Sequence, residues 1–128
     1  MNMDNAVEKL ASDSGILLHV AGKREGAGYT LLDFVFEHGS LRLVCDPDTD
    51  EIIVAVRPED SDGELDDLDD DIALASLRGK EIELAWSMTN HRGYDDAFQI
   101  RCLNLETRQE GCCQFEVAAA TITVARVS

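Results

Sequence analysis

Residues 80–105 read KEIELAWSMTNHRGYDDAFQIRCLNL. Asn90 and Gly93 lie in the polar middle of this stretch, and both residue types accept the backbone angles of a tight hairpin turn. On either side, apolar side chains fall at every second position, which is the period of a half-buried β-strand; they are Ile82, Leu84, Trp86 and Met88 before the turn, and Phe98, Ile100 and Cys102 after it. The stretch therefore predicts a β-hairpin with strands at 80–88 and 97–105.

The same alternation recurs along most of the chain. It predicts five further strands, at 15–22, 29–39, 40–46, 51–58 and 113–127. In the last of these the pattern slips at three consecutive alanines, where we expect a bulge or bend. Short helices are predicted at 3–12 and 72–79, the second following acidic residues and ending at Gly79 as its C-cap. Because most connections are of hairpin length, we expect an α+β fold with a mostly antiparallel sheet of about seven strands and one or two short helices.

Charge is the strongest feature of the composition. The 128 residues form one predicted domain, 1–128, and contain 26 acidic residues against 11 Lys and Arg, a net charge of −15. An acidic loop is predicted at 59–71, a segment without a basic residue. Such a charge disfavours binding to nucleic acid or to an anionic membrane, and it would steer a basic protein partner toward the chain.

The compartment is predicted from the N-terminus and the cysteines. MNMDNAVEKLASDSG at 1–15 lacks the basic and apolar regions of a signal peptide, and no apolar run reaches the roughly 18 residues that a membrane span needs. Four cysteines in such a chain are typical of free thiols rather than of a disulfide framework; they are Cys45, Cys102, Cys112 and Cys113. We therefore expect a cytoplasmic protein.

No motif for catalysis, metal or cofactor binding stands out. The sequence has no nucleophile elbow, P-loop or dinucleotide-binding glycine pattern, and its cysteines lack the spacing of a zinc site. Asp46, Asp48 and Asp50 match the first positions of a calcium loop, but Glu51 and Arg57 stand where the loop needs Gly and a bidentate Glu. We therefore predict no catalytic residue, no metal and no cofactor, and we favour a protein that is not an enzyme.

Three arginines, Arg42, Arg57 and Arg101, fall on outward-facing strand positions. If their strands were neighbours, the guanidinium groups could converge into an anion site. The alternative, which we favour, is cross-strand pairing with carboxylates such as that of Asp33.

The region around the 80–105 turn is the candidate binding surface. A turn alone accounts for Asn90 and Gly93 but does not require His91, Arg92 and Tyr94, and Arg and Tyr are enriched in interface anchors. The alternatives are a plain turn and a turn that also serves recognition. For the second, the predicted binding residues are Trp86, Asn90, His91, Arg92, Tyr94, Asp95 and Asp96.

The second half of the chain also carries a longer pattern, L-x-G-K-x-I-x-x-A-W-x-x-x-N-x-x-G-Y-x-D-A, at residues 77–97. With it, and with DPDTDEII at 46–53, the chain resembles a family of short bacterial proteins assigned to a domain of unknown function. The resemblance implies no catalytic residue. It makes Trp86, Asn90, Gly93, Tyr94 and Asp96 the preferred positions to test.

Two functions remain open. The first is a non-catalytic protein-binding module, for example an immunity- or antitoxin-like inhibitor of a basic partner; a second copy of the chain, giving a homodimer, is another possible partner. The second is an enzyme or small-ligand binder with its site at the 90–96 hairpin, which needs a concave pocket and an imidazole within reach of a carboxylate. We favour the first.

Overall fold

The computed structural model describes residues 14–46, 48–57, 65–68, 70–89, 95–118 and 120–127. The predicted helix at 3–12 lies outside these residues. The elements are β1 (Leu17–Glu25), β2 (Gly28–Phe36), β3 (Gly39–Asp46), β4 (Glu51–Arg57), β5 (Asp66–Asp67), α2 (Ile72–Ala75), β6 (Glu81–Thr89), β7 (Asp95–Leu103), β8 (Glu110–Ala118) and β9 (Thr121–Arg126).

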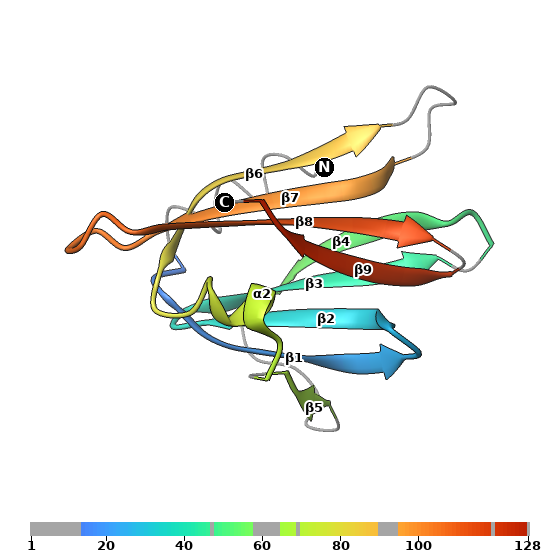
Figure 1. Ribbon diagram of the computed structural model, residues 1–128, viewed down its shortest axis with the longest axis horizontal. Helices are drawn as coiled ribbons and strands as arrows, with labels where there is room; N and C mark the ends of the chain where they lie inside the picture. The colour runs from blue at the N-terminus through green and yellow to red at the C-terminus, as the bar shows by residue number, and fades with distance from the viewer. Residues whose placement is uncertain are drawn as a thin grey trace.

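The strands form one antiparallel sheet that curls on itself (Figure 1). Seven of them follow the path β4-β3-β2-β9-β8-β7-β6, while β1 pairs with β2 and β5 pairs with β1. The two halves of the path meet where Tyr29 of β2 pairs with Ile122 of β9. An isolated bridge between Ile16 and Glu81 links the start of β1 to the start of β6. The result is two layers, β1–β4 and β6–β9, that face each other.

The core lies between these layers. The rings of Phe34 on β2 and Phe115 on β8 meet edge to face, with their centroids 5.5 Å apart. The inward residues that alternation predicts on β2, β3 and β7 are buried; they are Leu32, Phe34, Phe36, Leu41, Leu43, Cys45, Phe98, Ile100 and Cys102. On β2 the opposite face is buried as well, at Asp33 and Val35, although alternation predicts that this face is exposed. Burying each large apolar side chain stabilises the fold by about 1.5–3 kcal/mol.

The predicted fold class is confirmed in part. The sheet is mostly antiparallel, but the protein is mostly β rather than α+β, because α2 has four residues instead of the eight predicted. The helix ends early, at the C-cap Ser76, and a turn follows. Gly79 lies at the end of this turn with a φ of 75°, and β6 begins two residues later.

Two other predictions need correction. The strand expected at 113–127 is a hairpin, β8 and β9, in which Ala118 pairs with Thr121. Ala120 has a φ of 62°, so the slip in the alternation marks a complete turn rather than a bulge. The acidic segment expected to be a loop contains β5, whose two residues pair with Ala21 and Gly22 of β1.

Candidate functional site

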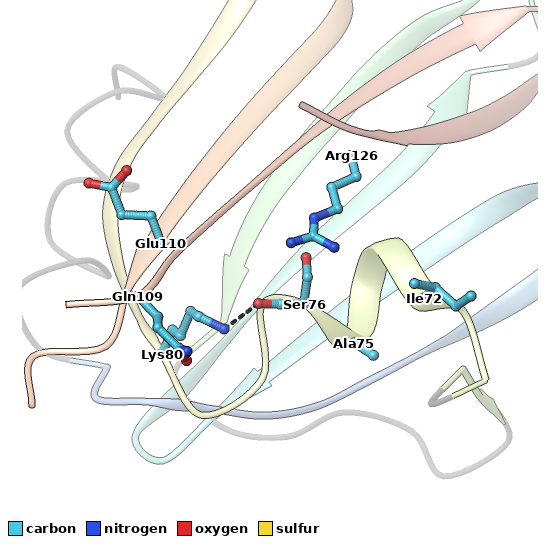
Figure 2. Close-up of a pocket in the computed structure, with 7 residues that line it drawn as sticks. All are labelled: Ile72, Ala75, Ser76, Lys80, Gln109, Glu110 and Arg126. Atoms are coloured by element: carbon cyan, nitrogen blue, oxygen red, sulfur yellow. Dashed lines mark hydrogen bonds between the residues drawn. The ribbon is translucent and has the colours of Figure 1, made fainter. Parts of the chain in front are cut away.

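An open pocket of about 470 Å³ lies beside α2, where the beginnings of β6 and β8 meet the end of β9 (Figure 2). Its walls combine two cations, one carboxylate, an amide, a serine and two apolar side chains; they are Lys80, Arg126, Glu110, Gln109, Ser76, Ile72 and Ala75. None of these residues belongs to the predicted site. The pocket is within the size range of ligand sites in proteins.

The capped helix α2 supplies one wall of the pocket. The Asp71 carboxylate accepts a hydrogen bond from the backbone N–H of Leu74 at 3.1 Å and so caps the helix N-terminus. Leu74 and Leu77 are buried in the core, which leaves Ile72 and Ala75 facing outward. This anchoring places Ser76 at the floor of the pocket.

Gly111 permits α2 to approach β8 this closely. A Cβ at position 111 would lie 2.7 Å from the carbonyl oxygen of Ser76 and 3.3 Å from a methyl group of Leu77. The Ser76 hydroxyl donates to the Ala73 carbonyl at 2.6 Å, and the Cys113 thiol donates to the same carbonyl at 3.1 Å. The end of the helix is therefore fixed to β8 by hydrogen bonds as well as by packing.

Lys80 is held at the pocket by the connection from α2 to β6. Its neighbour Gly79 donates its N–H to the Leu17 carbonyl, and Leu17 donates to the Lys80 carbonyl. The Lys80 ammonium donates to the Ser76 carbonyl at 2.5 Å. An ammonium has three N–H donors. This hydrogen bond therefore fixes the position of the cation while using one of its three donors.

Arg126 and Glu110 come from neighbouring ends of the sheet. Arg126 is the last residue of β9 and pairs with Cys113, while Glu110 is the first residue of β8. Figure 2 shows the guanidinium of Arg126 directed toward the hydroxyl of Ser76, while Lys80 reaches the Ser76 carbonyl and the carboxylate of Glu110 points away from both cations. The pocket therefore presents positive charge at its floor on a chain whose net charge is −15.

The predicted binding surface lies at the other end of β6. Trp86 is half-buried and pairs with Gln99, and Asp95 pairs with Thr89 just after a shift in the β6–β7 register. Asp96 is also half-buried, on β7. The other four residues predicted there, Asn90, His91, Arg92 and Tyr94, lie outside the described residues, as does Gly93. Since a strand rises about 3.3 Å per residue, roughly 30 Å of β6 separates this end from Lys80.

One of the three strand arginines forms a cross-strand ion pair. Arg42 Nη2 lies 3.3 Å from Oδ2 of the buried Asp33, its direct cross-strand neighbour, which confirms the pairing that we favoured. Arg101 is on β7, and three strands lie between it and β3 in the sheet. The side chain of Arg57 lies outside the described part of the structure.

The cysteine thiols are buried and free. Burial raises the pKa of Cys102 to about 12 and that of Cys113 to about 11. A thiol acts as a nucleophile or metal ligand as its thiolate, so both residues are packing groups at neutral pH. Within the described residues no three His, Cys, Asp or Glu side chains are grouped as a metal site would require.

The acidic turn matched to a calcium loop is held by its own carboxylates. Asp46 accepts a hydrogen bond from the backbone N–H of Asp48 at 2.9 Å. Asp50 accepts from the N–H of Ala120 at 3.1 Å, which ties the β3–β4 turn to the β8–β9 turn.

The fold and the pocket define a small, mostly-β protein with a mixed-charge surface pocket. The chain belongs to a family described as Family of unknown function (DUF6334), whose model matches residues 2–128. The comparison with curated proteins gives no match, and neither does the comparison with solved structures. In the part of the chain that the structure describes, no helix has the length and apolar character to cross a membrane.

Proposed function

We propose that this chain is a non-catalytic protein-binding module for a basic partner, acting in the cytoplasm. The observation that carries the proposal is the surplus of carboxylates, 26 acidic residues against 11 Lys and Arg. Opposite charge speeds the encounter of two proteins and selects against partners of the wrong sign. An inhibitor of the immunity or antitoxin type is one form that such a module takes.

The β1–β5 edge of the sheet is the surface that we assign to this partner. Asp66 and Asp67 of β5 are exposed there, beside β1. Asp70 follows, with 69% of its side chain exposed, and forms an ion pair with Arg24. Carboxylates at a sheet edge face water and also discourage unwanted strand pairing, so this edge suits a charged partner rather than an apolar one.

The compartment in the proposal has its own support. The four free thiols favour a reducing compartment such as the cytoplasm. The 86–96 segment stays a predicted recognition surface, and an enzyme or small-ligand site at the 90–96 hairpin stays the alternative. A homodimer is the other possible assembly.

The test is partner capture followed by kinetics. The wild-type chain is used to capture proteins from native lysate at about 50 mM and about 500 mM NaCl, and the protein retained at low salt is purified. We expect a basic protein whose association rate constant with the wild type falls at least about tenfold between the two salt concentrations. The variant Asp66→Asn/Asp67→Asn should show a lower association rate constant at low salt.

The matched control is Glu83→Gln/Glu106→Gln, which removes the same charge from exposed positions on β6 and on the β7–β8 turn. Equal rates for the two double variants would remove the β1–β5 edge from the proposal. A captured protein with no excess of basic residues would contradict the proposal as a whole. The variant Arg92→Ala/Tyr94→Ala, assayed in the same way, tests whether the 86–96 segment contributes.

A further inference from the structure

We propose that the pocket between α2 and the ends of β6, β8 and β9 binds the carboxylate of a small organic acid. This site is separate from the protein-binding edge proposed above. It rests on the geometry of the pocket and on the chemistry of the seven side chains that line it.

The floor of the pocket is suited to a carboxylate. The Lys80 ammonium is fixed there by its hydrogen bond to the Ser76 carbonyl, and the guanidinium of Arg126 is directed toward the hydroxyl of the same residue (Figure 2). A guanidinium presents paired N–H donors that match the two oxygens of a carboxylate, and bonds of this kind are about twice as strong as neutral ones. The Gln109 amide, also in the lining, can donate a further bond.

The wall formed by α2 is suited to an alkyl group. Ile72 is 80% exposed although it is a large apolar residue, and it lines the pocket together with Ala75. An aliphatic tail of three or four carbons would cover the Ile72 side chain and remove apolar surface from water, at about 0.8 kcal/mol for each fully buried CH₂. The ligand is therefore an organic acid rather than an inorganic anion.

Glu110 is turned away from the two cations of the pocket. It is the one carboxylate of the pocket lining and lies at the rim, with its oxygens directed away from Lys80 and Arg126. A carboxylate and phosphate both match cationic donors, but only an alkyl carboxylate also covers the apolar wall formed by Ile72 and Ala75. Monocarboxylates are thus favoured over phosphate.

The experiment is an NMR titration of the full ¹⁵N-labelled chain with sodium butyrate, sodium acetate and sodium phosphate in turn, at constant ionic strength set with NaCl. We expect butyrate to give saturable shifts of the amide signals of Ala75, Ser76, Lys80 and Glu110. Its dissociation constant should be about threefold to tenfold lower than that of acetate, because two more methylene groups are partly buried. Phosphate should bind more weakly than butyrate.

Variants identify the groups responsible. Arg126→Gln, at an exposed position, should raise the dissociation constant for butyrate by at least about fivefold. The matched control Lys23→Gln removes one positive charge from an exposed position on β1 and should leave binding unchanged. Ile72→Ser should bring the affinities for butyrate and acetate together without changing the acetate affinity.

Three results would overturn the proposal: shifts that are linear in concentration and spread over the chain, equal affinity for phosphate and butyrate, or an Arg126→Gln affinity equal to that of Lys23→Gln. None of these results bears on the β1–β5 edge, which is tested by its own variants. Failure of the protein-binding proposal likewise leaves the butyrate titration unaffected.

Discussion

At the scale of single residues, Asp33 is a buried carboxylate that is costly to leave without its counter-charge. It is 1% exposed, on the central strand β2, and its charge is balanced by Arg42 on β3. The Arg42 side chain is itself only 16% exposed. Taking two charges out of water costs free energy that their attraction offsets only while both are present.

We therefore expect Arg42→Met, which keeps an apolar stem but removes the guanidinium, to lower the free energy of unfolding by about 3 kcal/mol. Urea denaturation of the wild type and the variant measures this loss. The double variant Asp33→Asn/Arg42→Met removes the buried charge as well and should recover part of the stability. A loss below about 1 kcal/mol for the single variant would show that the pair contributes little.

The buried thiols make a second prediction at this scale, for alkaline pH. The ordinary pKa of a thiol is about 9, and burial raises it to about 12 for Cys102 and about 11 for Cys113. Above pH 9 the unfolded chain loses protons that the folded chain keeps, so the free energy of unfolding falls as pH rises. Each thiol contributes a slope of up to about 1.4 kcal/mol per pH unit until the pH reaches its folded pKa.

Urea denaturation at pH values of about 8, 9 and 10 tests this. The stability contributed by the protonated thiols is complete below pH 9 and should decline above it. Cys113→Ala should have a shallower decline than the wild type, whatever its stability at pH 8. The same slope in both proteins would mean that Cys113 does not titrate differently in the folded and unfolded states.

At the scale of elements, the alternation of apolar and polar residues predicted those strands that pack one face against the core. Strands with one buried face, such as β3 with Leu41, Leu43 and Cys45, carry a period of two that is visible in the sequence. The β8–β9 turn was missed because alanine occurs on buried and exposed faces alike and so does not mark the end of a strand. In addition, a positive φ is usually signalled by glycine, whereas here it falls on Ala120. β5 was missed because a two-residue strand of aspartates, paired with β1, has no apolar face to read.

The pocket was harder to predict than the strands. Lys80 and Arg126 are 46 positions apart, and only the strand order, with β9 beside β8 and α2 alongside β9, brings them to one place. The one sequence signal was the Gly79–Lys80 step after a predicted helix, within the longer pattern at 77–97. Nothing in the alternation of β9 distinguishes Arg126 from an ordinary solvent-facing residue.

The short helix α2 depends on its cap, which gives a prediction at this scale. Four residues are too few for a stable isolated helix, so its stability comes from the Asp71 cap and from the packing of Leu74. Asp71 also accepts the hydrogen bond from the Tyr29 hydroxyl. Asp71→Ala should therefore lower the free energy of unfolding by about 1–2 kcal/mol, as measured in urea.

The neighbouring Asp70 provides the control for Asp71→Ala. Its side chain is exposed and pairs with Arg24 in water, so Asp70→Ala should cost less than about 1 kcal/mol. If both alanine variants lost less than about 1 kcal/mol, the cap of α2 would contribute no more than a surface ion pair. A loss of about 1–2 kcal/mol in both variants would instead assign Asp70 a larger role than its exposure indicates.

At the scale of the whole molecule, the net charge of −15 acts on the fold as well as on partners. Carboxylates spread over a compact domain repel one another, and unfolding relieves this repulsion. Salt screens it, since the Debye length falls to about 10 Å at 0.1 M ionic strength. Local ion pairs act in the opposite direction, because screening weakens attraction too, but exposed pairs such as Arg24–Asp70 contribute little.

Repulsion should therefore dominate, and the thermal midpoint should rise by several degrees, about 3–6 °C, between about 20 mM and about 300 mM NaCl. Scanning calorimetry in NaCl and in KCl distinguishes screening, which is the same in both salts, from binding of one cation. Glu83→Gln/Glu106→Gln should have a higher midpoint at low salt and gain less from added salt, because two of the exposed repelling charges are gone. A midpoint that falls with salt would mean that attraction within ion pairs outweighs repulsion among the carboxylates. The acidic surface would then be stabilised by the Lys and Arg side chains of the chain itself, which would compete with those of a basic partner.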